Sequence, residues 1–521
     1  MKLNDLLKEI EDKEVIGNRS LEVSRISYNS KDVVENSLFI AIKGSKSDGH
    51  TFISEAISKG ARAVVVEKLP KGIKDVTVIL TYDTRLAMAK IAARFYNDPS
   101  SDIVLVGITG TNGKTTTAYL VESIFEEAGL KTGMIGTINY HYGEKTIPAS
   151  MTTPESLDIQ RILSEMAEDG VTHVVMEVSS HALDLKRVES LHFNAGLFTN
   201  LTQDHLDYHQ TMEHYFRSKA ILFNRLLAKA GNNGVSYAIL NEDDPYSKIL
   251  SENTTPHIIH YGVKNKADVF PVNTLLTLDG ISAEIETPKG TLRIKSPLIG
   301  EFNLYNILAA IGVGISQKIP LNDIKRGIES LDSVPGRFER IESKEGIGII
   351  VDYAHTGDAL KRTLETIKSI SKGRIITVFG CGGDRDKLKR PIMGAISGKY
   401  SDLSIITSDN PRTENPNTII EAIKEGMEGS GAREYNQMDS MGNFSQKGYI
   451  TIVDRLEAIR FAIDTAKPRD TVLIAGKGHE DYQITGDKRT PFNDRKEARN
   501  AIAQREKALS LKCPKQTINS Q

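Results

Sequence analysis

Short apolar runs alternate with segments of helical spacing along most of the chain. Between residues 99 and 333 the predicted buried strands cover 103–108, 171–178, 195–199 and 237–241, and the predicted helices cover 155–168, 213–228 and 304–317. Strands that alternate with helices are typical of a doubly wound, mostly parallel sheet, which collects its ligands at the carboxyl ends of the strands. We therefore expect a central α/β domain over residues 99–333.

The same alternation returns in residues 334–505. Predicted strands lie at 347–351, 374–379, 403–407 and 471–475, and predicted helices at 357–370, 418–425 and 455–466. This favours a second, Rossmann-like α/β domain. Residues 1–98 carry β-rich runs at 23–28, 37–42, 63–66 and 77–80, with helical spacing at 1–11, 54–59 and 84–96. We expect a small N-terminal α/β domain there, and three α/β domains in all.

Three further segments depart from this alternation. Residues 258–295 are β-rich, with a hairpin expected at 278–281. Residues 432–447 are polar and aperiodic, which predicts a long surface loop. Residues 506–521 are expected to form a disordered tail.

The strongest chemical signal follows the first strand of the central domain. The loop Gly110-Thr111-Asn112-Gly113-Lys114-Thr115-Thr116 leads into a helix expected from residue 117 onward. In such a loop the backbone N–H groups wrap a phosphate, the lysine reaches the outer phosphates and a threonine hydroxyl holds Mg²⁺. Ile108 stands where the usual loop of this kind has glycine, so the loop is a variant. We expect a P-loop-type sheet that binds a nucleoside triphosphate.

The composition limits which binding partners and which cellular compartment are compatible with this chemistry. The 66 Lys and Arg residues nearly balance the 68 Asp and Glu residues, and no basic block is present, which argues against nucleic-acid or membrane-surface binding. The two cysteines, Cys381 and Cys513, are too few for a disulfide framework. No signal peptide or apolar run of spanning length is found. We expect a cytoplasmic protein with small-molecule substrates.

A polar cluster follows the predicted strand 171–178. Glu177 lies at its tip, close to where the phosphate loop is expected, and is a candidate ligand of Mg²⁺. The alternative for Ser179 and Ser180 is capping of the next helix. A Ser-His hydrolase with His181 is disfavoured, because no G-x-S-x-G turn is present.

Three histidines, His205, His209 and His214, follow in the segment 199–214. The first two share the i, i+4 spacing of a zinc site, but the glutamate of H-E-x-x-H is missing. We expect one histidine beside Mg²⁺ and no zinc. Lys219, considered alone, has the pattern of a solvated helix lysine.

Three loops of the third domain follow predicted strands, at 379–391, 408–416 and 475–480. The first carries four cations after its glycines, namely Arg385, Lys387, Lys389 and Arg390, which predicts a local anion site. We expect the three loops to converge, with Arg385 and Arg412 facing a carboxylate and Glu480 facing an ammonium group. An amino acid is the ligand that satisfies such a set.

Taken in order, these loops resemble the ATP-dependent Mur ligases of peptidoglycan synthesis over residues 27–480. The segments that carry the resemblance are GTNGKTT, EVSSHAL, TNLTQDHLDYH, YFRSKAILF, FNLYNILAAI, VPGRFERI, VDYAHTGDAL, FGCGGDRDKLKRP, SDNPRTENP and AGKGHE. The resemblance is greatest to the branch that adds the third residue of the peptide. It implies that ATP phosphorylates the D-glutamate side-chain carboxylate of a UDP-muramoyl dipeptide, and that an amino acid's amine then attacks the acyl phosphate. Catalysis would rest on positioning and on neutralising charge.

The resemblance also assigns roles to single residues. It implies that Lys114, Glu177, His205 and Lys219 are catalytic, and that Thr115, Glu177, His205 and a carbamylated Lys219 hold Mg²⁺. The implied nucleotide contacts are Gly110, Thr111, Asn112, Gly113, Lys114, Thr115, Thr116, Asn303, Asn306, Arg337, Asp352 and His355. The implied UDP-muramoyl-peptide contacts are Ser30, Thr152, Thr153, Ser179 and Arg187. The implied amino-acid contacts are Arg385, Asp409, Asn410, Pro411, Arg412, Gly476 and Glu480.

The motif Asp409-Asn410-Pro411-Arg412 is similar to that of the family members that add meso-diaminopimelate. The distal carboxylate of diaminopimelate would pair with Arg412, whereas lysine would leave that arginine unpaired. The alternatives are the same reaction with lysine, a folylpolyglutamate synthetase-like ligase, and a nucleotide-dependent switch protein. We expect a monomer.

Overall fold

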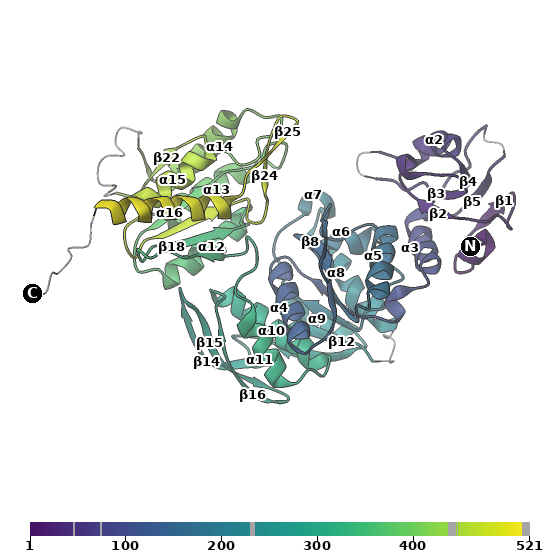
Figure 1. Cartoon of the computed structure of the whole chain (residues 1–521), viewed down its shortest axis with the longest axis horizontal. Helices are drawn as coiled ribbons and strands as arrows, with labels where there is room; N and C mark the ends of the chain where they lie inside the picture. The colour runs from purple at the N-terminus through teal and green to yellow at the C-terminus, as the bar shows by residue number, and fades with distance from the viewer. Residues whose placement is uncertain (45–46, 73–74, 230–234, 436–443, 445, 513–521) are drawn as a thin grey trace, which may run out of the picture. The chain divides into compact units, whose positions relative to one another are not determined.

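The structure is a computed structural model, and it describes residues 1–44, 47–72, 75–229, 235–435, 444 and 446–512. The chain divides into two compact units, whose elements are labelled in Figure 1. The first unit comprises residues 1–272, 285–292 and 305–328, and the second comprises residues 273–284, 293–304 and 329–521. The expected N-terminal domain and most of the expected central domain thus lie in one unit, whereas residues 273–284, 293–304 and 329–333 belong to the other.

The N-terminal sheet has five strands in the order β1-β5-β4-β3-β2. Its elements are α1 (Leu3–Leu6), β1 (Glu14–Ile16), β2 (Arg25–Ser27), β3 (Ser37–Ile40), α2 (Ile53–Ser58), β4 (Ala61–Val66), β5 (Thr77–Leu80) and α3 (Thr84–Phe95). The four predicted strands are present, and they pair in parallel. Strand β1, antiparallel to β5, was not predicted because its three residues carry no apolar pattern. The helix expected over residues 1–11 is only one turn long.

The central sheet has eight strands in the order β13-β12-β11-β6-β10-β7-β8-β9. They are β6 (Val104–Thr109), β7 (Thr132–Ile135), β8 (Asn139–Tyr142), β9 (Lys145–Pro148), β10 (His173–Glu177), β11 (Ala195–Phe198), β12 (Tyr237–Asn241) and β13 (His257–Tyr261). Every pair from β13 to β7 is parallel, and the hairpin β8–β9 closes one edge. The mostly parallel sheet is confirmed. Strand β6 lies between β11 and β10, and a ligand site is expected at the carboxyl end of such a switch point.

Helices connect these strands. They are α4 (Lys114–Glu127), α5 (Ser156–Glu168), α6 (Ser180–Asp184), α7 (Leu206–His209), α8 (Met212–Ile221), α9 (Pro245–Asn253), α10 (Glu301–Ser316) and α11 (Leu321–Ser330). The helical segment expected over 213–228 is present, but it is not one α-helix: α8 ends at Ile221 and continues as a π-helix (Leu222–Leu226) and a 3₁₀ turn (Leu227–Lys229). Such π segments are frequent at functional sites.

The second unit contains a seven-stranded sheet in the order β17-β18-β23-β19-β20-β22-β21. Its strands are β17 (Glu339–Ile341), β18 (Gly348–Asp352), β19 (Ile375–Phe379), β20 (Leu403–Ile406), β21 (Arg433–Glu434), β22 (Gly448–Thr451) and β23 (Thr471–Ala475). All pairs are parallel except β17–β18. The four predicted strands of this sheet are present, and β21 and β22 complete one edge.

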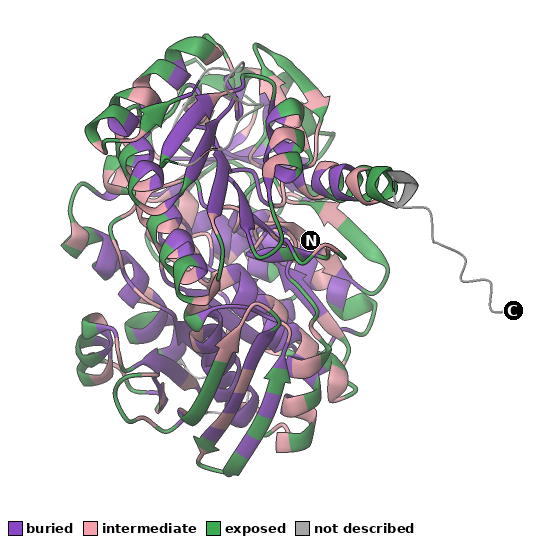
Figure 2. Ribbon diagram, turned by 90° about the vertical axis from the view of Figure 1, so that its left-hand side faces the viewer, coloured by how far each residue is buried: buried purple, intermediate pink, exposed green. Residues whose placement is uncertain are grey.

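Helices cover both faces of this sheet. They are α12 (Gly357–Ile370), α13 (Lys389–Tyr400), α14 (Pro416–Gly429), α15 (Arg455–Thr465) and α16 (Asp494–Lys512). Successive strand residues pack alternately into two cores: Ile376 and Val378 face α15 and α16, whereas Ile375 and Phe379 face α12, α13 and α14. Figure 2 shows the strands buried and the helices exposed on their outer sides. The doubly wound expectation therefore holds here as well.

Two smaller β elements complete the chain. The strands β14 (Phe270–Thr277), β15 (Gly280–Thr287) and β16 (Gly290–Ser296) form a three-stranded sheet, and a turn at Leu278 and Asp279 confirms the predicted hairpin. The hairpin β24 (Tyr482–Thr485) and β25 (Lys488–Pro491) was not predicted.

The expected C-terminal tail needs one correction. Helix α16 runs to Lys512, so residues 506–512 are helical, in keeping with their Ala, Leu, Lys and Glu content. Residues 513–521 lie outside the described residues, as does most of the loop expected at 432–447.

Candidate active site

The phosphate loop is a tight turn between the end of β6 and the start of α4. Gly110 and Gly113 have φ angles of +143° and +89°. A Cβ atom would lie 1.9 Å from Thr199 Oγ1 at Gly110 and 2.4 Å from Asn306 Oδ1 at Gly113. Only glycine fits at either position. The path of the loop is therefore set by its neighbours in β11 and α10.

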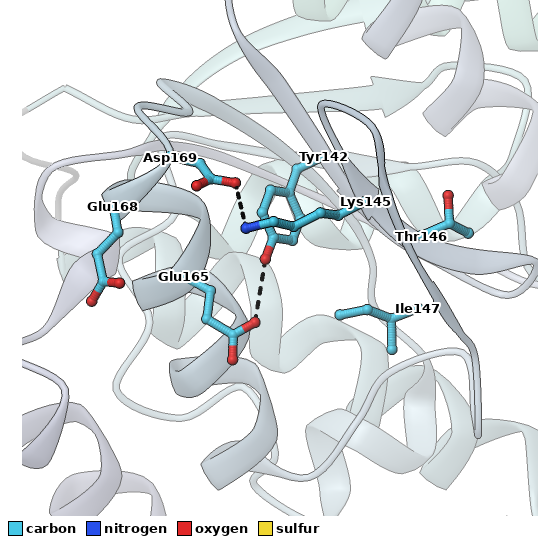
Figure 3. A pocket seen from close by; sticks show the side chains of 7 residues that line it. All are labelled: Tyr142, Lys145, Thr146, Ile147, Glu165, Glu168 and Asp169. Carbon is cyan, nitrogen blue, oxygen red and sulfur yellow. Dashed lines mark hydrogen bonds and ion pairs between the residues drawn. The ribbon is translucent and has the colours of Figure 1, made fainter.

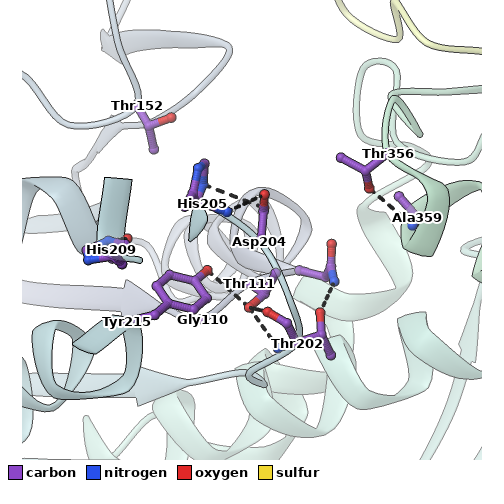
Figure 4. Close-up of polar contacts among 12 residues, drawn as sticks. Gly110, Thr111, Thr152, Thr202, Asp204, His205, His209, Tyr215, Thr356 and Ala359 are labelled. Atoms are coloured by element: carbon purple, nitrogen blue, oxygen red, sulfur yellow. Dashed lines mark hydrogen bonds and ion pairs between the residues drawn. The ribbon is translucent and has the colours of Figure 1, made fainter. Parts of the chain in front are cut away.

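Helix α4 begins at Lys114, three residues before the predicted start. Its first N–H groups consequently belong to the loop and can face an anion. Lys114 Nζ donates to the carbonyl oxygens of Gly110 (3.0 Å) and Thr111 (2.8 Å), so the lysine folds over its own loop. Thr111 Oγ1 also lies 3.1 Å from the hydroxyl of Tyr215 (Figure 4).

Glu177 ends β10 beside this loop and is 1% exposed. Its carboxylate accepts hydrogen bonds from Thr115 Oγ1 (3.0 Å), Thr137 N (2.8 Å) and Thr137 Oγ1 (3.0 Å). Within the described part of the chain, no cation forms an ion pair with it. A buried carboxylate next to a threonine hydroxyl is the oxygen set that Mg²⁺ prefers, so these residues fit the ion.

Lys219 lies on α8 and is 1% exposed, which excludes the solvated-lysine alternative. Its Nζ donates to Gly110 O at 2.8 Å and lies 4.5 Å from the centroid of the Tyr215 ring. Burial, with the nearby charge of Lys114, holds the pKa of Lys219 well below its usual value. Burial therefore favours the neutral amine over the ammonium ion. A neutral amine can add to carbon dioxide, whereas an ammonium ion cannot.

His205 stands at the start of α7 with a left-handed backbone (φ +54°). Its Nε2 lies 3.5 Å from Asp204 Oδ2, as drawn in Figure 4. Burial lowers the pKa of His205, and Lys114 and Lys219 lower it further, so His205 faces the same charges as the phosphate loop. The described residues contain no group of three or more His, Cys, Asp or Glu that could hold a metal ion.

His209 instead forms a buried pair with Ser180. Its Nε2 lies 2.9 Å from Ser180 Oγ and its Nδ1 lies 3.4 Å from Ser218 Oγ, and His209 and Ser180 are each 1% exposed. A hydrolase would need an accessible serine and a group that orients the imidazole, usually a carboxylate. The pair has neither, so it is a packing contact between α6, α7 and α8.

The residues expected to hold the muramoyl peptide gather next to Glu177, with one exception. Thr153 Oγ1 donates to Glu177 O (2.8 Å) and accepts from Ser179 N (3.0 Å), and Arg187 Nη1 donates to Thr153 O (3.2 Å). Thr152 Oγ1 lies 3.1 Å from Thr137 Oγ1. Ser179 also caps α6, so the capping alternative holds too. Ser30 lies in the N-terminal domain, at the start of a 3₁₀ turn (Ser30–Asp32), where its Oγ donates to Glu55 Oε2 at 2.9 Å.

Sequence reasoning missed Glu155, the carboxylate that pairs with Arg187. Glu155 forms ion pairs with Arg187 Nε (3.1 Å) and with Arg85 Nη1 (2.8 Å), and its side chain is 8% exposed. The bridge joins residues that are far apart in the sequence, and no local pattern signals it.

Among the expected nucleotide contacts, Asn306 lies in the first unit and accepts from Thr117 Oγ1 at 3.3 Å. Asn303 belongs to the second unit, is 1% exposed, and donates to Ile299 O at 2.8 Å. The guanidinium of Arg337 lies 4.4 Å from the centroid of the Tyr353 ring. Asp352 accepts from Phe338 N at 2.8 Å and therefore ties the turn after Arg337 to the end of β18.

His355, the last expected nucleotide contact, is exposed three residues beyond the end of β18. Its Nδ1 lies 2.9 Å from Tyr353 O.

The three loops at the carboxyl ends of β19, β20 and β23 converge, as predicted. Arg412 Nη1 donates to Gly383 O at 2.8 Å, and a Cβ atom on Gly383 would lie 1.9 Å from Pro411 O. A Cβ atom on Gly476 would lie 2.7 Å from Asp409 Oδ2. The glycines therefore allow the loops to pack directly against one another.

The expected site of four cations is wrong. Helix α13 begins at Lys389 and turns Arg390 inward, where it is 2% exposed and pairs with Glu414 at 2.8 Å. Lys387 lies 3.8 Å from the same carboxylate, and Lys389 Nζ donates to His355 O. Arg385 is exposed and donates to Asp384 O. Sequence reasoning overlooked Lys477, which is fully buried and hydrogen-bonded to Glu480 and Asn410.

A surface pocket of about 470 Å³ lies elsewhere, between the hairpin β8–β9 and the end of α5 (Figure 3). Its lining residues are Tyr142, Lys145, Thr146, Ile147, Glu165, Glu168 and Asp169. Lys145 and Asp169 form an ion pair across it at 2.8 Å. None of the predicted site residues lines this pocket.

The sequence matches the models of three known protein-family domains. Residues 22–96 match the model described as "Mur ligase family, catalytic domain", residues 108–314 the "Mur ligase middle domain", and residues 336–478 the "Mur ligase, glutamate ligase domain". The chain belongs to the Mur ligase family. The three matches fall one within each expected domain of this Mur ligase.

Curated relatives extend over nearly the whole chain. A protein of Geobacter metallireducens is 48% identical over 502 residues, covering 96% of this chain and 98% of its own. A protein of Caldanaerobacter subterraneus is 43% identical over 509 residues, covering 97% of this chain and 100% of its own. Both are named UDP-N-acetylmuramoyl-L-alanyl-D-glutamate--2,6-diaminopimelate ligase.

Solved structures agree on the fold. A structure of a ligase with that same name is 30% identical and has a TM-score of 0.69, covering 97% of this chain and 99% of its own. MurF of Thermotoga maritima, solved with ADP, is 20% identical with a TM-score of 0.60 and covers 94% of this Mur ligase and 98% of its own chain. Folylpolyglutamate synthase of Mycobacterium tuberculosis covers only 75% of this chain, at 17% identity. No helix in the described ranges is long and apolar enough to cross a membrane.

Proposed function

We propose that this Mur ligase joins meso-2,6-diaminopimelate to the D-glutamate side-chain carboxylate of UDP-N-acetylmuramoyl-L-alanyl-D-glutamate. ATP is cleaved to ADP and phosphate, and the carboxylate passes through an acyl phosphate. One observation carries the proposal: the 48% identity over 96% of the chain to a ligase named for this reaction. The residues around Gly110, Glu177 and Glu480 supply a physical account of it.

The first half of the reaction brings two anions together, the γ-phosphate of ATP and the acceptor carboxylate. Lys114 and the first N–H groups of α4 are the donors for the phosphates. Thr115 and Glu177 would hold Mg²⁺, with His205 nearby. When bound, the ion would neutralise charge on the phosphate oxygens. The protein's own contribution is to fix these groups around the loop before the substrates arrive.

Lys219 has a role here only if its charge is reversed. As an ammonium it would add a third positive group beside Lys114 and the metal. Reaction of the neutral amine with carbon dioxide forms an N–C bond, releases one proton and leaves a carbamate anion. The lowered pKa of Lys219 favours that reaction. We infer that carbamylated Lys219 is the second carboxylate of the magnesium site, which Glu177 alone does not complete.

In the second half of the reaction, the incoming amino acid must be bound through the groups at its distal end. Arg412 and Arg385 would receive the distal carboxylate of diaminopimelate, and Glu480 with Asn410 the distal ammonium. Asp409, Pro411 and Gly476 shape this loop cluster. Lysine lacks the carboxylate, so Arg412 would lose its partner. This favours diaminopimelate over the lysine alternative.

The remaining substrates are assigned to residues by the same reasoning. Ser30, Thr152, Thr153, Ser179 and Arg187 would bind the UDP-muramoyl peptide, and Asn303, Asn306, Arg337, Asp352 and His355 would bind the nucleotide. The UDP-muramoyl peptide and the nucleotide are both small molecules, as the substrates of Mur ligases are in general.

Release of phosphate from ATP by the purified protein tests the proposal. We expect release only when both the UDP-muramoyl dipeptide and diaminopimelate are present, with lysine a poor replacement. Release with lysine at a comparable rate would favour the lysine alternative. ATP binding without any turnover would favour a nucleotide-dependent switch protein.

A further inference from the structure

Lys477 is the one lysine of the three converging loops that is completely buried, with 0% of its surface exposed. Its Nζ donates to Glu480 Oε2 at 3.0 Å and to Asn410 Oδ1 at 3.2 Å, and lies 5.5 Å from the centroid of the Tyr482 ring. A buried ammonium group is costly unless it is paired, so this position needs a reason.

The reason lies in the geometry of Glu480. Both Lys477 Nζ and Asn410 Nδ2 donate to the same carboxylate oxygen, Oε2, at 3.0 and 2.8 Å. Asn410 is itself fixed, because its Oδ1 accepts from Ile484 N at 3.0 Å. In the described ranges no residue donates to the other oxygen, Oε1. The carboxylate is therefore held in one orientation, and its side chain keeps 17% exposure.

We propose that Lys477 is a positioning residue that fixes Glu480 so that Oε1 receives the distal ammonium of the incoming amino acid. This rests on the proposed function, because it concerns the same amino-acid site. Lys477 does not touch the substrate. It also balances the charge of Glu480 before the substrate binds.

The test separates orientation of Glu480 from general support of the fold. Lys477→Met has a similar length and no N–H donor. It is assayed with meso-diaminopimelate and with 2-aminopimelate, which keeps the distal carboxylate but lacks the distal amine. We expect kcat/KM for diaminopimelate to fall about 10- to 100-fold, mainly through KM, and that for 2-aminopimelate to change less than about threefold. The KM values for ATP and the UDP-dipeptide should stay within about twofold.

Two further variants sharpen the result. Lys477→Gln keeps an amide donor and should retain an intermediate preference for diaminopimelate, and it replaces the methionine variant if that one fails to fold. Lys488→Met, an exposed lysine of β25, is the matched control and should behave as the wild type.

An equal fall in kcat/KM for diaminopimelate and 2-aminopimelate, in a folded Lys477 variant, would overturn the proposal and show that Lys477 is a structural residue. Unchanged kcat/KM with both would overturn it as well. Failure of the proposed function would be recognised separately, because the wild type itself would then show no turnover that depends on diaminopimelate.

Discussion

Lys219 Nζ donates a hydrogen bond of 2.8 Å to the carbonyl oxygen of Gly110, the first residue of the phosphate loop. The contact spans 109 positions of the sequence and places a buried amine directly behind the loop that is expected to carry ATP. Lys114 donates to the same oxygen at 3.0 Å. Two ammonium groups that donate to one carbonyl oxygen would repel each other. We therefore expect one of the two lysines to be neutral or to be converted to an anion.

The first prediction concerns Lys219. Replacing Lys219 with alanine removes the amine that we expect to be carbamylated, and we expect kcat to fall about 100- to 1,000-fold, because charge on the transferred phosphate is no longer balanced. Added formate or acetate should restore part of the rate by supplying a carboxylate in the space left behind. ADP release is measured in a coupled assay. The surface variant Lys248→Ala should keep the wild-type rate, and full activity of Lys219→Ala would contradict the carbamate.

A second prediction addresses the choice of amino acid. Arg412→Lys keeps a positive charge but loses the planar fork that binds a carboxylate in two places. We expect kcat/KM for diaminopimelate to fall about 100-fold, while the low rate with lysine changes little. Initial rates with both amino acids give the ratio. A variant that keeps the wild-type ratio would remove Arg412 from the recognition of the distal carboxylate.

The third prediction tests what supports the amino-acid loops. Arg455 and Asp494 are both 0% exposed and pair at 2.7 Å, and Arg455 Nη2 also donates to Ala475 O at the end of β23. Arg455→Met leaves the buried Asp494 charge without its partner, at a cost of about 3–5 kcal/mol in the stability of the second unit. The chain has no Trp, so urea unfolding is followed by circular dichroism. Arg362→Met, which breaks an exposed pair with Asp358, should cost less than about 1 kcal/mol. Similar losses of unfolding free energy for Arg455→Met and Arg362→Met would contradict the claim that burial makes the Arg455–Asp494 pair the more costly one to break.

The fourth prediction is a pH dependence. Burial, together with the nearby His181 and His214, lowers the pKa of His209 to about 4. In the unfolded chain this histidine has an ordinary pKa of about 6.5 and takes up its proton first. The contribution of neutral His209 to the free energy of unfolding is therefore fully present above pH 6.5 and is lost as the pH falls toward 4. The shift is worth at most about 3 kcal/mol.

The variant His209→Gln cannot titrate in this range, and its amide can still meet Ser180. Its melting temperature should therefore decline less steeply than that of the wild type between pH 7 and pH 5. Parallel curves would show that His209 is not the group that senses pH.

The phosphate loop could be predicted because its signal is local. A strand, two glycines, Lys114 and the start of α4 follow one another without a break, and the fold brings them together automatically. The parallel sheets were predicted for the same reason, from alternating strands and helices. The short strands β1, β7, β8, β9, β21 and β22 were not, because strands of two to four residues carry too little pattern.

The supporting contacts of the candidate site could not be predicted. The ion pair of Glu155 with Arg85 spans 70 positions, and the hydrogen bond of Lys477 with Asn410 spans 67. Each side chain alone has the sequence pattern of a surface charge. The four cations of residues 385–390 show the opposite error: they are close in sequence, but the first turn of α13 sends Arg390 into the core.

Transfer of oxygen tests the central claim most directly. The D-glutamate side-chain carboxylate of the UDP-dipeptide is labelled with ¹⁸O, and the phosphate released during ligation with diaminopimelate is analysed by mass spectrometry. An acyl phosphate passes one carboxylate oxygen to phosphate when the amine displaces it, so the account predicts one ¹⁸O atom in each phosphate formed. Unlabelled phosphate alongside normal product would contradict it.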